Sequence, residues 1–195
     1  MKSVLISIKP KYCELIVSGK KTIEIRKTAP NLETPFKCYI YCSKEKPFIQ
    51  KISFGDIAIS NTQISKNLYN GKVIGEFICE EIEPLTEYEL LYGLDEINDS
   101  IIAKYSCLDT DELLRYKGKN DLLYGWHISA LKIYDKPKEV SEFYKKDFDE
   151  AYSDWEDLYC IGVSGCGSVV YPIEPKEEDF RLSRPPRNWC YVEEL

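Results

Sequence analysis

Apolar and polar residues alternate along much of this chain, and the alternation predicts short β-strands with a few helices between them. Residues 4–9 alternate as a half-buried strand does. The next stretch has apolar residues at helical spacing, begins with Pro10 at a first helical position and ends at Gly19. Residues 22–26 return to strand alternation. The sequence therefore opens with a strand, a short helix and a second strand.

The second of these strands carries polar side chains along one face. Thr22, Glu24 and Arg26 alternate with two isoleucines, so successive polar groups on that face lie about 7 Å apart. Such a row forms either a solvated surface or the wall of a polar pocket. Ser7 and Lys9 share one face of the first strand in the same way. If the short helix returns the chain beside its start, the polar faces of both strands line one cleft.

The charges of this cleft suit a nucleic acid ligand. Lys9, Lys21 and Arg26 would supply donors for phosphate or carbonyl oxygens, and an arginine can also bind a base edge through two hydrogen bonds. Glu24 would accept a hydrogen bond from an exocyclic amine such as that of cytosine. The alternative is an exposed ion pair between Glu24 and Arg26, worth at most about 1 kcal/mol.

Further strands follow, and helices are inserted between them. Strand alternation recurs over 36–42, 57–64, 72–83, 122–134 and 188–192. Asn70-Gly71 indicates a hairpin turn, residues 135–137 indicate a strand break, and residues 86–92 and 109–116 indicate short helices. Because no strand–helix alternation persists, an antiparallel barrel without exposed edges is favoured over a parallel sheet. The expected fold class is α+β, a mainly antiparallel β-barrel of about six strands with inserted helices.

Length and composition favour one soluble domain. A chain of 195 residues with 44% hydrophobic and 13% aromatic residues is ordinary for a globular protein with one sizeable core. We expect a single domain over 1–195, with a helical insertion around 86–118 and an irregular insertion around 143–182. No apolar run approaches the roughly 20 residues that span a bilayer, and the N-terminus lacks a signal-peptide pattern. We therefore expect a cytoplasmic protein without a membrane partner.

The eight cysteines are expected to be reduced in that compartment. Four of them fall inside strand or helix patterns, where a cysteine acts as a small buried hydrophobe. These four are Cys13, Cys38, Cys42 and Cys79. Cys160, Cys166 and Cys190 could offer three thiolates to zinc, but the usual pattern of two short cysteine pairs is absent. We therefore expect reduced thiols and no metal or other cofactor.

The net charge of −7 argues against a protein that coats duplex nucleic acid without sequence preference. The charge is unevenly distributed, because residues 1–51 hold 11 Lys and Arg against 4 Asp and Glu. A basic first third on an acidic body indicates a localised surface that attracts anions. Lysine-rich loops are also common as ordinary solvated surfaces.

Four segments of the chain resemble the ASCH domain family, whose small β-barrels are related to PUA domains. They are SIKPKYCELIVSGKKTIEIRK, NGKVIGEFICEEIEPLT, YGWHISALKIYDKP and the terminal RPPRNWCYVEEL. The chain looks closest to ASCH proteins of Gram-positive bacteria and their phages. The resemblance implies a PUA-like barrel and favours a site in the cleft. The basic first third and the polar residues of the cleft indicate single-stranded RNA or a single nucleotide or nucleoside, modified or not, as the ligand.

The family also includes a bacterial N4-acetylcytidine amidohydrolase with a similar G-x-K-T-x-x-x-R segment. By this resemblance Lys21 matches the catalytic lysine, and Thr22 and Arg26 match two further residues of the motif. Glu24 stands where that enzyme has its catalytic threonine, so its carboxylate would act as a general base or bind a ligand instead. Lys21 and Glu24 are the catalytic candidates if the protein is an enzyme, either an amidohydrolase or a metal-free ribonuclease.

Aromatic residues and a C-terminal arginine complete the candidate binding site. A base could stack on Tyr41, Trp126 or Trp189, although aromatic residues in small barrels usually fill the core. Arg187 would reach the cleft if the terminal strand closes the barrel. The candidate ligand-binding residues are Ser7, Lys9, Thr22, Glu24, Arg26, Tyr41, Trp126, Arg187 and Trp189.

Three functions remain open from the sequence. The leading hypothesis is binding of RNA or of a single nucleotide in the cleft. The second is catalysis in the same cleft; His127 is the only histidine, which excludes a two-histidine nuclease, and we expect it to be structural. The third is a protein-interaction module whose acidic segment, between Thr86 and Trp155, meets a basic partner.

Overall fold

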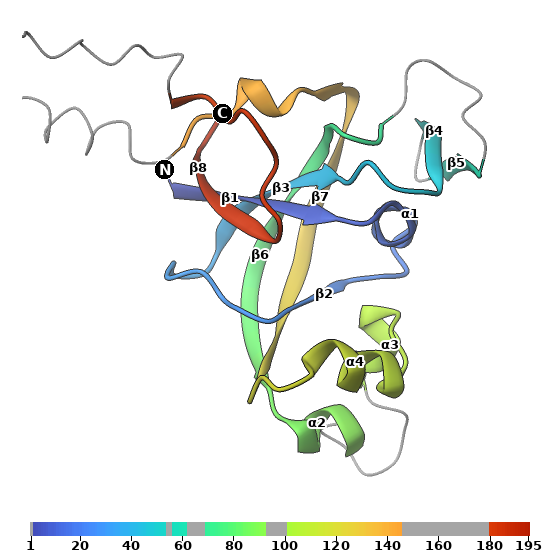
Figure 1. Cartoon of the computed structure of the whole chain (residues 1–195), viewed down its shortest axis with the longest axis vertical. Coiled ribbons are helices and arrows are strands. Elements are labelled where there is room, and N and C mark those ends of the chain that lie inside the picture. Colours follow the sequence, from blue (N-terminus) through green and yellow to red (C-terminus); the bar gives the residue numbers. More distant parts are fainter. Residues whose placement is uncertain (1, 54–55, 62–68, 93–100, 146–179) are drawn as a thin grey trace, which may run out of the picture.

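The computed structural model describes residues 2–53, 56–61, 69–92, 101–145 and 180–195. Its main feature is a six-stranded sheet with the order β2-β7-β6-β3-β1-β8 (Figure 1). The strands are β1 (Lys2–Ile8), β2 (Ile23–Arg26), β3 (Phe36–Cys42), β6 (Val73–Leu85), β7 (Leu123–Lys138) and β8 (Trp189–Glu193). β1 and β3 pair in parallel, and every other pairing in this sheet is antiparallel.

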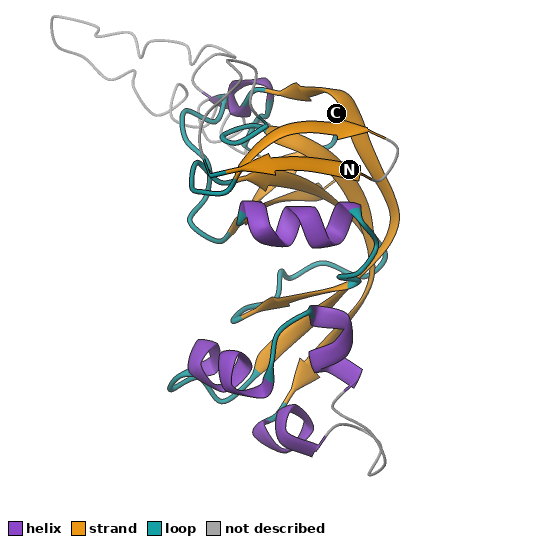
Figure 2. Cartoon of the chain, turned by 90° about the vertical axis from the view of Figure 1, so that its right-hand side faces the viewer, coloured by secondary structure: helices purple, strands orange, loops and turns teal. Residues whose placement is uncertain are grey.

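Helices and one small hairpin surround this sheet. The strands β4 (Phe48–Ser53) and β5 (Asp56–Ser60) form a separate two-stranded sheet. The helices are α1 (Pro10–Val17), α2 (Glu87–Tyr92), α3 (Ile101–Ser106) and α4 (Thr110–Lys117), with a 3-10 turn, η1, at Val140–Glu142. Figure 2 shows that the sheet is strongly curved, that α1 lies on its hollow side, and that α2 to α4 gather at one end of β6 and β7.

The predicted α+β class with six mainly antiparallel strands is confirmed, but the sheet is not closed into a barrel. The edge strands β2 and β8 share no hydrogen-bonded ladder in the described part of the chain. Side chains bridge this open seam instead, because Arg26 bonds Asn188 and the Trp189 indole Nε1 donates to Thr28 Oγ1 at 3.0 Å. Where backbone hydrogen bonds between β2 and β8 would close a barrel, a few specific side-chain contacts link the two edges instead.

The sequence led us to expect that the two opening strands lie side by side, and this expectation is wrong. β1 pairs with β3 and β8, whereas β2 pairs with β7 at the other edge of the sheet. The helix α1 carries the chain across the hollow side, so β2 approaches β1 through the curvature of the sheet. Their polar groups still meet, since Arg26 Nη2 donates to the Ser7 carbonyl at 2.7 Å.

Three apolar clusters hold the fold together. The largest lies between α1 and the hollow side of the sheet, and it contains all four cysteines that the strand and helix patterns predicted to be buried. Burial raises the pKa of the Cys13 thiol well above its ordinary value. A second cluster, around Tyr39, Tyr41 and Phe143, covers the other face. The third joins β2 and β7 to the helices α2 to α4, through residues such as Ile25 and Leu113.

Several local predictions need correction. β7 continues through the expected break at 135–137 and ends at Lys138. Asn70-Gly71 does form a turn, in which Lys72 N donates to the Tyr69 carbonyl at 3.3 Å, but no described strand directly before this turn pairs with β6, which pairs with β3 and β7. The Asn70 side chain accepts from Ile49 N and donates to the carbonyls of Glu45 and Pro47. The strand β4 was not anticipated. Residues 62–64 and most of the expected insertion at 143–182 lie outside the described residues.

In the described part of the chain, α2, α3 and α4 stand between β6 and β7, where the sequence placed a helical insertion. The capping residue Asp109 accepts from Glu112 N at 2.7 Å, and Glu112 returns a bond to Asp109 N, so α4 begins as its sequence predicts. No helix within the described ranges is long and apolar enough to cross a membrane. The division of the chain into one domain with two insertions stays a prediction.

Candidate functional site

A cavity of about 720 Å³ opens between α1, β2, α4 and the residues that precede β8. Its lining carries the cationic residues Lys9, Lys21, Arg26, Lys27, Arg115 and Arg187. The acidic residues of the lining are Glu24, Glu45 and Glu112. The cations outnumber the acids by two to one, although the whole chain has a net charge of −7. The cavity is therefore a locally basic site on an acidic protein.

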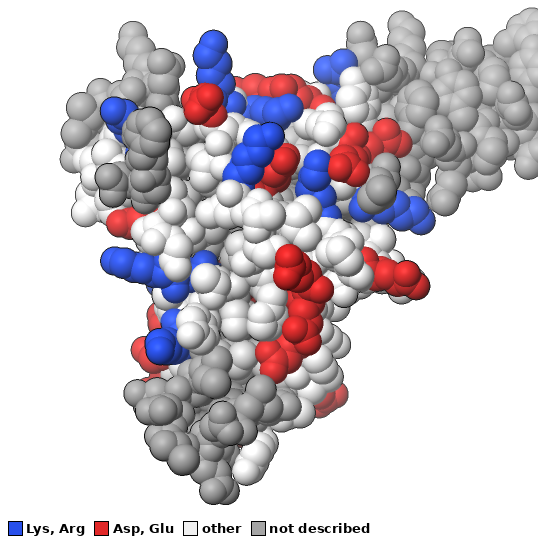
Figure 3. All heavy atoms as spheres, turned by 180° about the vertical axis from the view of Figure 1, so that it is seen from behind, with Lys and Arg blue, Asp and Glu red and all other residues white. Residues whose placement is uncertain are grey.

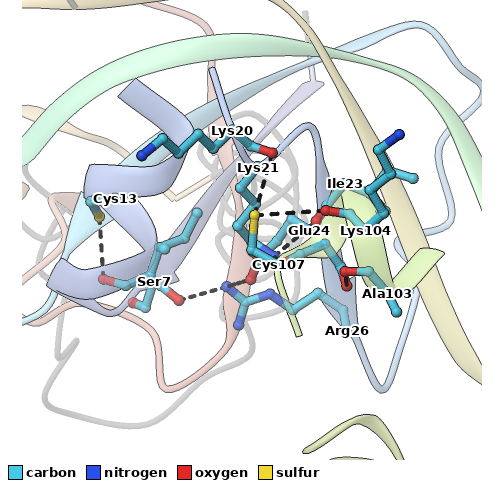
Figure 4. A network of polar contacts seen from close by, with 12 residues as sticks. Ser7, Cys13, Lys20, Lys21, Ile23, Glu24, Arg26, Ala103, Lys104 and Cys107 are labelled. Carbon is cyan, nitrogen blue, oxygen red and sulfur yellow. Dashed lines mark hydrogen bonds and ion pairs between the residues drawn. The ribbon is translucent and has the colours of Figure 1, made fainter. Parts of the chain in front are cut away.

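The inner wall of the cavity is a buried carboxylate between two buried cations (Figure 4). Glu24 Oε1 lies 2.9 Å from Arg26 Nη2, and Glu24 Oε2 lies 3.3 Å from Lys21 Nζ. All three side chains are less than 10% exposed. Of the two interpretations of the polar row on β2, the structure therefore has the wall of a polar pocket and not a solvated face.

Lys21 is held on every side by protein oxygens. Its ammonium donates to the Ile23 carbonyl at 2.8 Å and to the Ser106 carbonyl at 2.7 Å, and it pairs with Glu24. Two of its three N–H donors thus make hydrogen bonds to backbone carbonyls, and Glu24 balances its charge as an ion-pair partner. The Ser106 carbonyl ends α3, which joins the inner wall of the cavity to the inserted helices.

The neighbours of Lys21 join the same two segments. Thr22 N donates to the Tyr105 carbonyl at 2.9 Å, and the Cys107 thiol contacts the Lys20 carbonyl at 3.3 Å. Residues 20–22 are thus bound, one after another, to residues 105–107. This clamp, as we call the two facing tripeptides, fixes the end of α3, and α4 then follows directly over the cavity.

Arg26 closes the opposite side of the cavity. Its Nη1 donates to Asn188 Oδ1 at 2.8 Å, and its Nη2 also donates to the Ser7 carbonyl at 2.7 Å. The Ser7 hydroxyl donates to the Pro186 carbonyl at 2.6 Å, so the segment before β8 is bound to β1 as well. The Arg26 Nε atom is buried and has no hydrogen-bond partner within the described residues.

Two tyrosines and several exposed charges form the outer part of the cavity. Tyr12 on α1 and Tyr116 on α4 both line it, and Lys27 Nζ lies 5.1 Å from the centre of the Tyr116 ring. Burial raises the pKa of Tyr116, and the nearby Arg26 guanidinium opposes this shift. At the mouth, Lys9 pairs with Glu45 at 3.6 Å; both side chains are largely exposed.

The structure brings six of the predicted residues together. Ser7, Lys9, Lys21, Glu24, Arg26 and Arg187 all line the cavity. Thr22 lies beside it and is bound through its backbone. The three aromatic candidates lie elsewhere: Tyr41 is 3% exposed in the second apolar cluster, and Trp126 is fully buried in the first. Trp189 packs against Trp126 with ring centres 6.0 Å apart. These three side chains fill the core, as aromatic residues in small β-folds commonly do.

Sequence reasoning missed Tyr12, Arg115 and Tyr116. Tyr12 belongs to the apolar stripe that predicts α1, and the stripe alone did not mark it as a site residue. The other two lie on a helix whose existence the capping signal predicts, but whose position over β2 depends on contacts between distant segments. The available signal was the Arg-Tyr pair that directly follows the two leucines of this short helix.

The remaining candidates either lie away from the cavity or fall outside the described residues. His127 on β7 lies with its Nε2 3.3 Å from Glu83 Oε2 and is not part of the lining. Cys160 and Cys166 lie outside the described residues, and burial raises the pKa of Cys190 to about 11. Within the described ranges, no cluster of three or more His, Cys, Asp or Glu side chains could hold a metal ion.

A strongly curved mixed sheet with inserted helices and a polar cavity at its seam defines an α+β protein with one candidate ligand site among the described residues. The family model of the ASCH domain matches residues 6–164, and the chain therefore belongs to the ASCH domain family. The expected resemblance to this family is confirmed. The narrower similarity to proteins of Gram-positive bacteria and phages stays a prediction.

Solved structures agree with this assignment. A crystal structure of ASCH from Zymomonas mobilis has 14% sequence identity and a TM-score of 0.53, covering 98% of this chain and 87% of that chain. The structure of a serine-to-alanine mutant of that protein has 14% identity and a TM-score of 0.51, covering 98% of this chain and 88% of that chain. At such low identity these similarities support the fold alone. No curated protein matches the chain.

Proposed function

We propose that this protein binds single-stranded RNA and takes one of its nucleotides into the cavity. The observation that carries the proposal is the basic cavity itself, with two tyrosines in its lining. Its volume of about 720 Å³ lies within the range of roughly 300–1,000 Å³ that is usual for small-ligand sites. Proteins that recognise single-stranded RNA commonly stack unpaired bases on aromatic rings and bind the phosphates with cations.

The distribution of charge on the protein surface favours contact with one to a few nucleotides over contact along a duplex. Acidic and basic side chains are interspersed on the face shown in Figure 3, which presents no continuous basic field of the kind that duplex DNA or RNA requires. The exposed cations Lys27, Arg115 and Arg187 instead all line the same cavity. Such an arrangement suits one to a few phosphates.

Binding is better supported than hydrolysis at the same site. A catalytic lysine needs access to the reacting atom, whereas the Lys21 ammonium is buried, donates to two backbone carbonyls and is paired with Glu24. Glu24 lies between two cations, an arrangement that stabilises the inner wall. Both groups therefore support the architecture of the cavity, and the exposed cations at its mouth are available to a ligand.

Fluorescence anisotropy with short single-stranded RNAs across a salt series tests the proposal. We expect binding at low salt that weakens with a log–log slope of about 0.7 per phosphate contact. The double variant Arg115→Ala with Arg187→Ala should bind at least tenfold more weakly and with a smaller slope. Lys132→Ala is the matched control, because Lys132 is exposed on β7 and lies outside the cavity.

Two outcomes would contradict the proposal. One is the absence of RNA binding at low salt by the native protein. The other is unchanged affinity in the double variant, since the cavity would then not be the binding site.

A further inference from the structure

We infer that the cavity selects nucleotides whose base carries an exocyclic amine beside an acceptor nitrogen, as cytosine and adenine do. The inference rests on the proposed function and specifies which ligand that site takes. It derives from the hydrogen-bonding state of Glu24 and Arg26, and from the order of charges between the inner wall and the mouth of the cavity.

Glu24 retains acceptor capacity. A carboxylate offers about four lone-pair positions, and the two cations beside Glu24 occupy one on each oxygen. Glu24 Oε2 has only the ion pair with Lys21 at 3.3 Å, and it makes no hydrogen bond to any described residue. Arg26 Nε is a buried donor that likewise makes no hydrogen bond to any described residue. The inner wall thus holds one acceptor and one donor that lack hydrogen-bond partners among the described residues.

Both atoms are shielded from solvent. A buried polar atom without a partner is costly to the protein, so a ligand that supplies the missing hydrogen bond gains affinity from it. Cytosine and adenine each present an N–H₂ donor next to a ring nitrogen that accepts. Such a donor and acceptor are chemically complementary to a carboxylate acceptor and a guanidinium donor such as Glu24 Oε2 and Arg26 Nε.

The order of charges orients the ligand. The cations of the inner wall already have protein partners, since Lys21 and Arg26 are bound to backbone carbonyls and to Glu24, whereas Arg115 and Arg187 are exposed and can attract a phosphate. The phosphate end of a nucleotide therefore stays outside and the base enters first. The edge of the base then faces the inner wall, where Glu24 can discriminate between a donor and an acceptor.

Uracil and hypoxanthine present the opposite pattern. Each has a carbonyl in place of the amine and an N–H in place of the acceptor nitrogen, so an oxygen would face the Glu24 carboxylate and a donor would face Arg26. Hydrogen-bond readout of a base edge commonly discriminates by about 5- to 150-fold. We expect at least tenfold weaker binding of these bases.

Two matched nucleotide pairs test the inference by isothermal titration calorimetry. CMP against UMP, and AMP against IMP, differ only in the amine-to-carbonyl exchange and the accompanying ring proton. The native protein should bind CMP and AMP at least tenfold more tightly than UMP and IMP. Glu24→Gln, whose amide can also donate to a carbonyl, should reduce both ratios to about twofold or invert them. Glu45→Gln, at the mouth, should change all four affinities by a similar factor and leave the ratios intact.

Equal affinity within both pairs for the native protein overturns the inference, whether or not Glu24→Gln folds. If the mononucleotides bind too weakly to measure, the same comparison is made with short oligo-C and oligo-U RNAs. RNA binding without a preference for oligo-C overturns this inference alone. Loss of all RNA binding overturns the proposed function as well, so the two failures are distinguishable.

Discussion

Arg26 on β2 donates a hydrogen bond to Asn188, which precedes β8, with a distance of 2.8 Å between Nη1 and Oδ1. The two residues are 162 positions apart in the chain and face each other across the open seam of the sheet. Because no backbone ladder joins β2 to β8 within the described ranges, this contact holds the seam while leaving space beside it. The cavity occupies that space. It therefore exists because side chains, and not backbone hydrogen bonds, join the β2 and β8 edges of the sheet.

Removing the acceptor of this contact should loosen the seam. Asn188→Ala leaves a buried arginine N–H without its partner, and we expect the free energy of unfolding to fall by about 1–2 kcal/mol. Asn188→Asp keeps an acceptor oxygen at the same position and should retain native stability. Urea denaturation of the two variants measures the difference, and equal stability would show that the contact carries no net free energy.

Lys21 should be essential to the clamp. Lys21→Met leaves Glu24 with one cation and removes the donor to the Ser106 and Ile23 carbonyls, so we expect a loss of about 3 kcal/mol or more. Lys20→Met is the control, because the Lys20 side chain is exposed and only its carbonyl takes part in the clamp. Urea denaturation tests both, and a loss below about 0.5 kcal/mol for Lys21→Met would contradict the structural role.

The acidic residues at the mouth should weaken ligand binding. Glu45 and Glu112 form exposed ion pairs with Lys9 and Lys11, at 3.6 and 3.7 Å, and thereby compete with phosphate for these cations. Replacing both by Gln should tighten RNA binding by about two- to tenfold at low salt, with the gain fading as salt is added. Glu33→Gln, in an exposed loop outside the cavity, should change nothing. Anisotropy titrations at two salt concentrations decide between these outcomes.

Tyr116 should contribute a stacking surface. Tyr116→Leu keeps an apolar side chain of similar reach but removes the ring, and base–aromatic stacking is worth about 1–3 kcal/mol. We therefore expect RNA affinity to fall by about five- to 100-fold. Tyr88→Leu alters an exposed tyrosine on α2, 65% accessible, that lies outside the cavity and should leave affinity unchanged. Equal affinities of the two variants would remove Tyr116 from the binding site.

Stability should fall in alkaline solution. Burial raises the pKa of Tyr39, Tyr41 and Tyr116 above the usual value of 10, and the pKa of Tyr134 is raised further, by burial and by its hydrogen bond to Glu76. The folded chain then keeps protons that the unfolded chain releases, so the free energy of unfolding decreases as pH rises above about 10.

Urea denaturation between pH 8 and pH 12 measures this decrease. Tyr134→Phe should make the loss of stability with pH less steep, whereas Tyr105→Phe, at an exposed position, should not. A pH dependence that is the same in both variants would mean that the Tyr134 hydroxyl does not contribute.

The sequence predicted local structure well where a local signal existed. α1 begins at Pro10 and is followed by Gly19 with a left-handed φ of 71°, and α4 begins after Asp109, because caps are properties of neighbouring residues. The polar row on β2 was also identified, including Glu24 and Arg26. Alternation alone could not decide whether that row faced water or a cavity.

Pairing of distant segments was beyond the reach of the sequence. Nothing in residues 4–26 indicates that β1 pairs with β3 and β8, because hydrophobic alternation fixes which face is buried and not which strand is adjacent. For the same reason Arg115 and Tyr116 were missed, since their place in the cavity follows from the docking of α4. The aromatic residues Trp126 and Trp189 were misplaced because core packing and base stacking favour the same side chains.

The clamp between residues 20–22 and 105–107 uses backbone carbonyls, a backbone N–H group, the Cys107 thiol and the Lys21 ammonium. None of its contacts depends on which side chains α4 presents to the cavity. Arg115 and Tyr116 can therefore be exchanged for other residues while the helix stays anchored. A redesign of ligand preference in this scaffold could begin with α4 and leave the rest of the fold untouched.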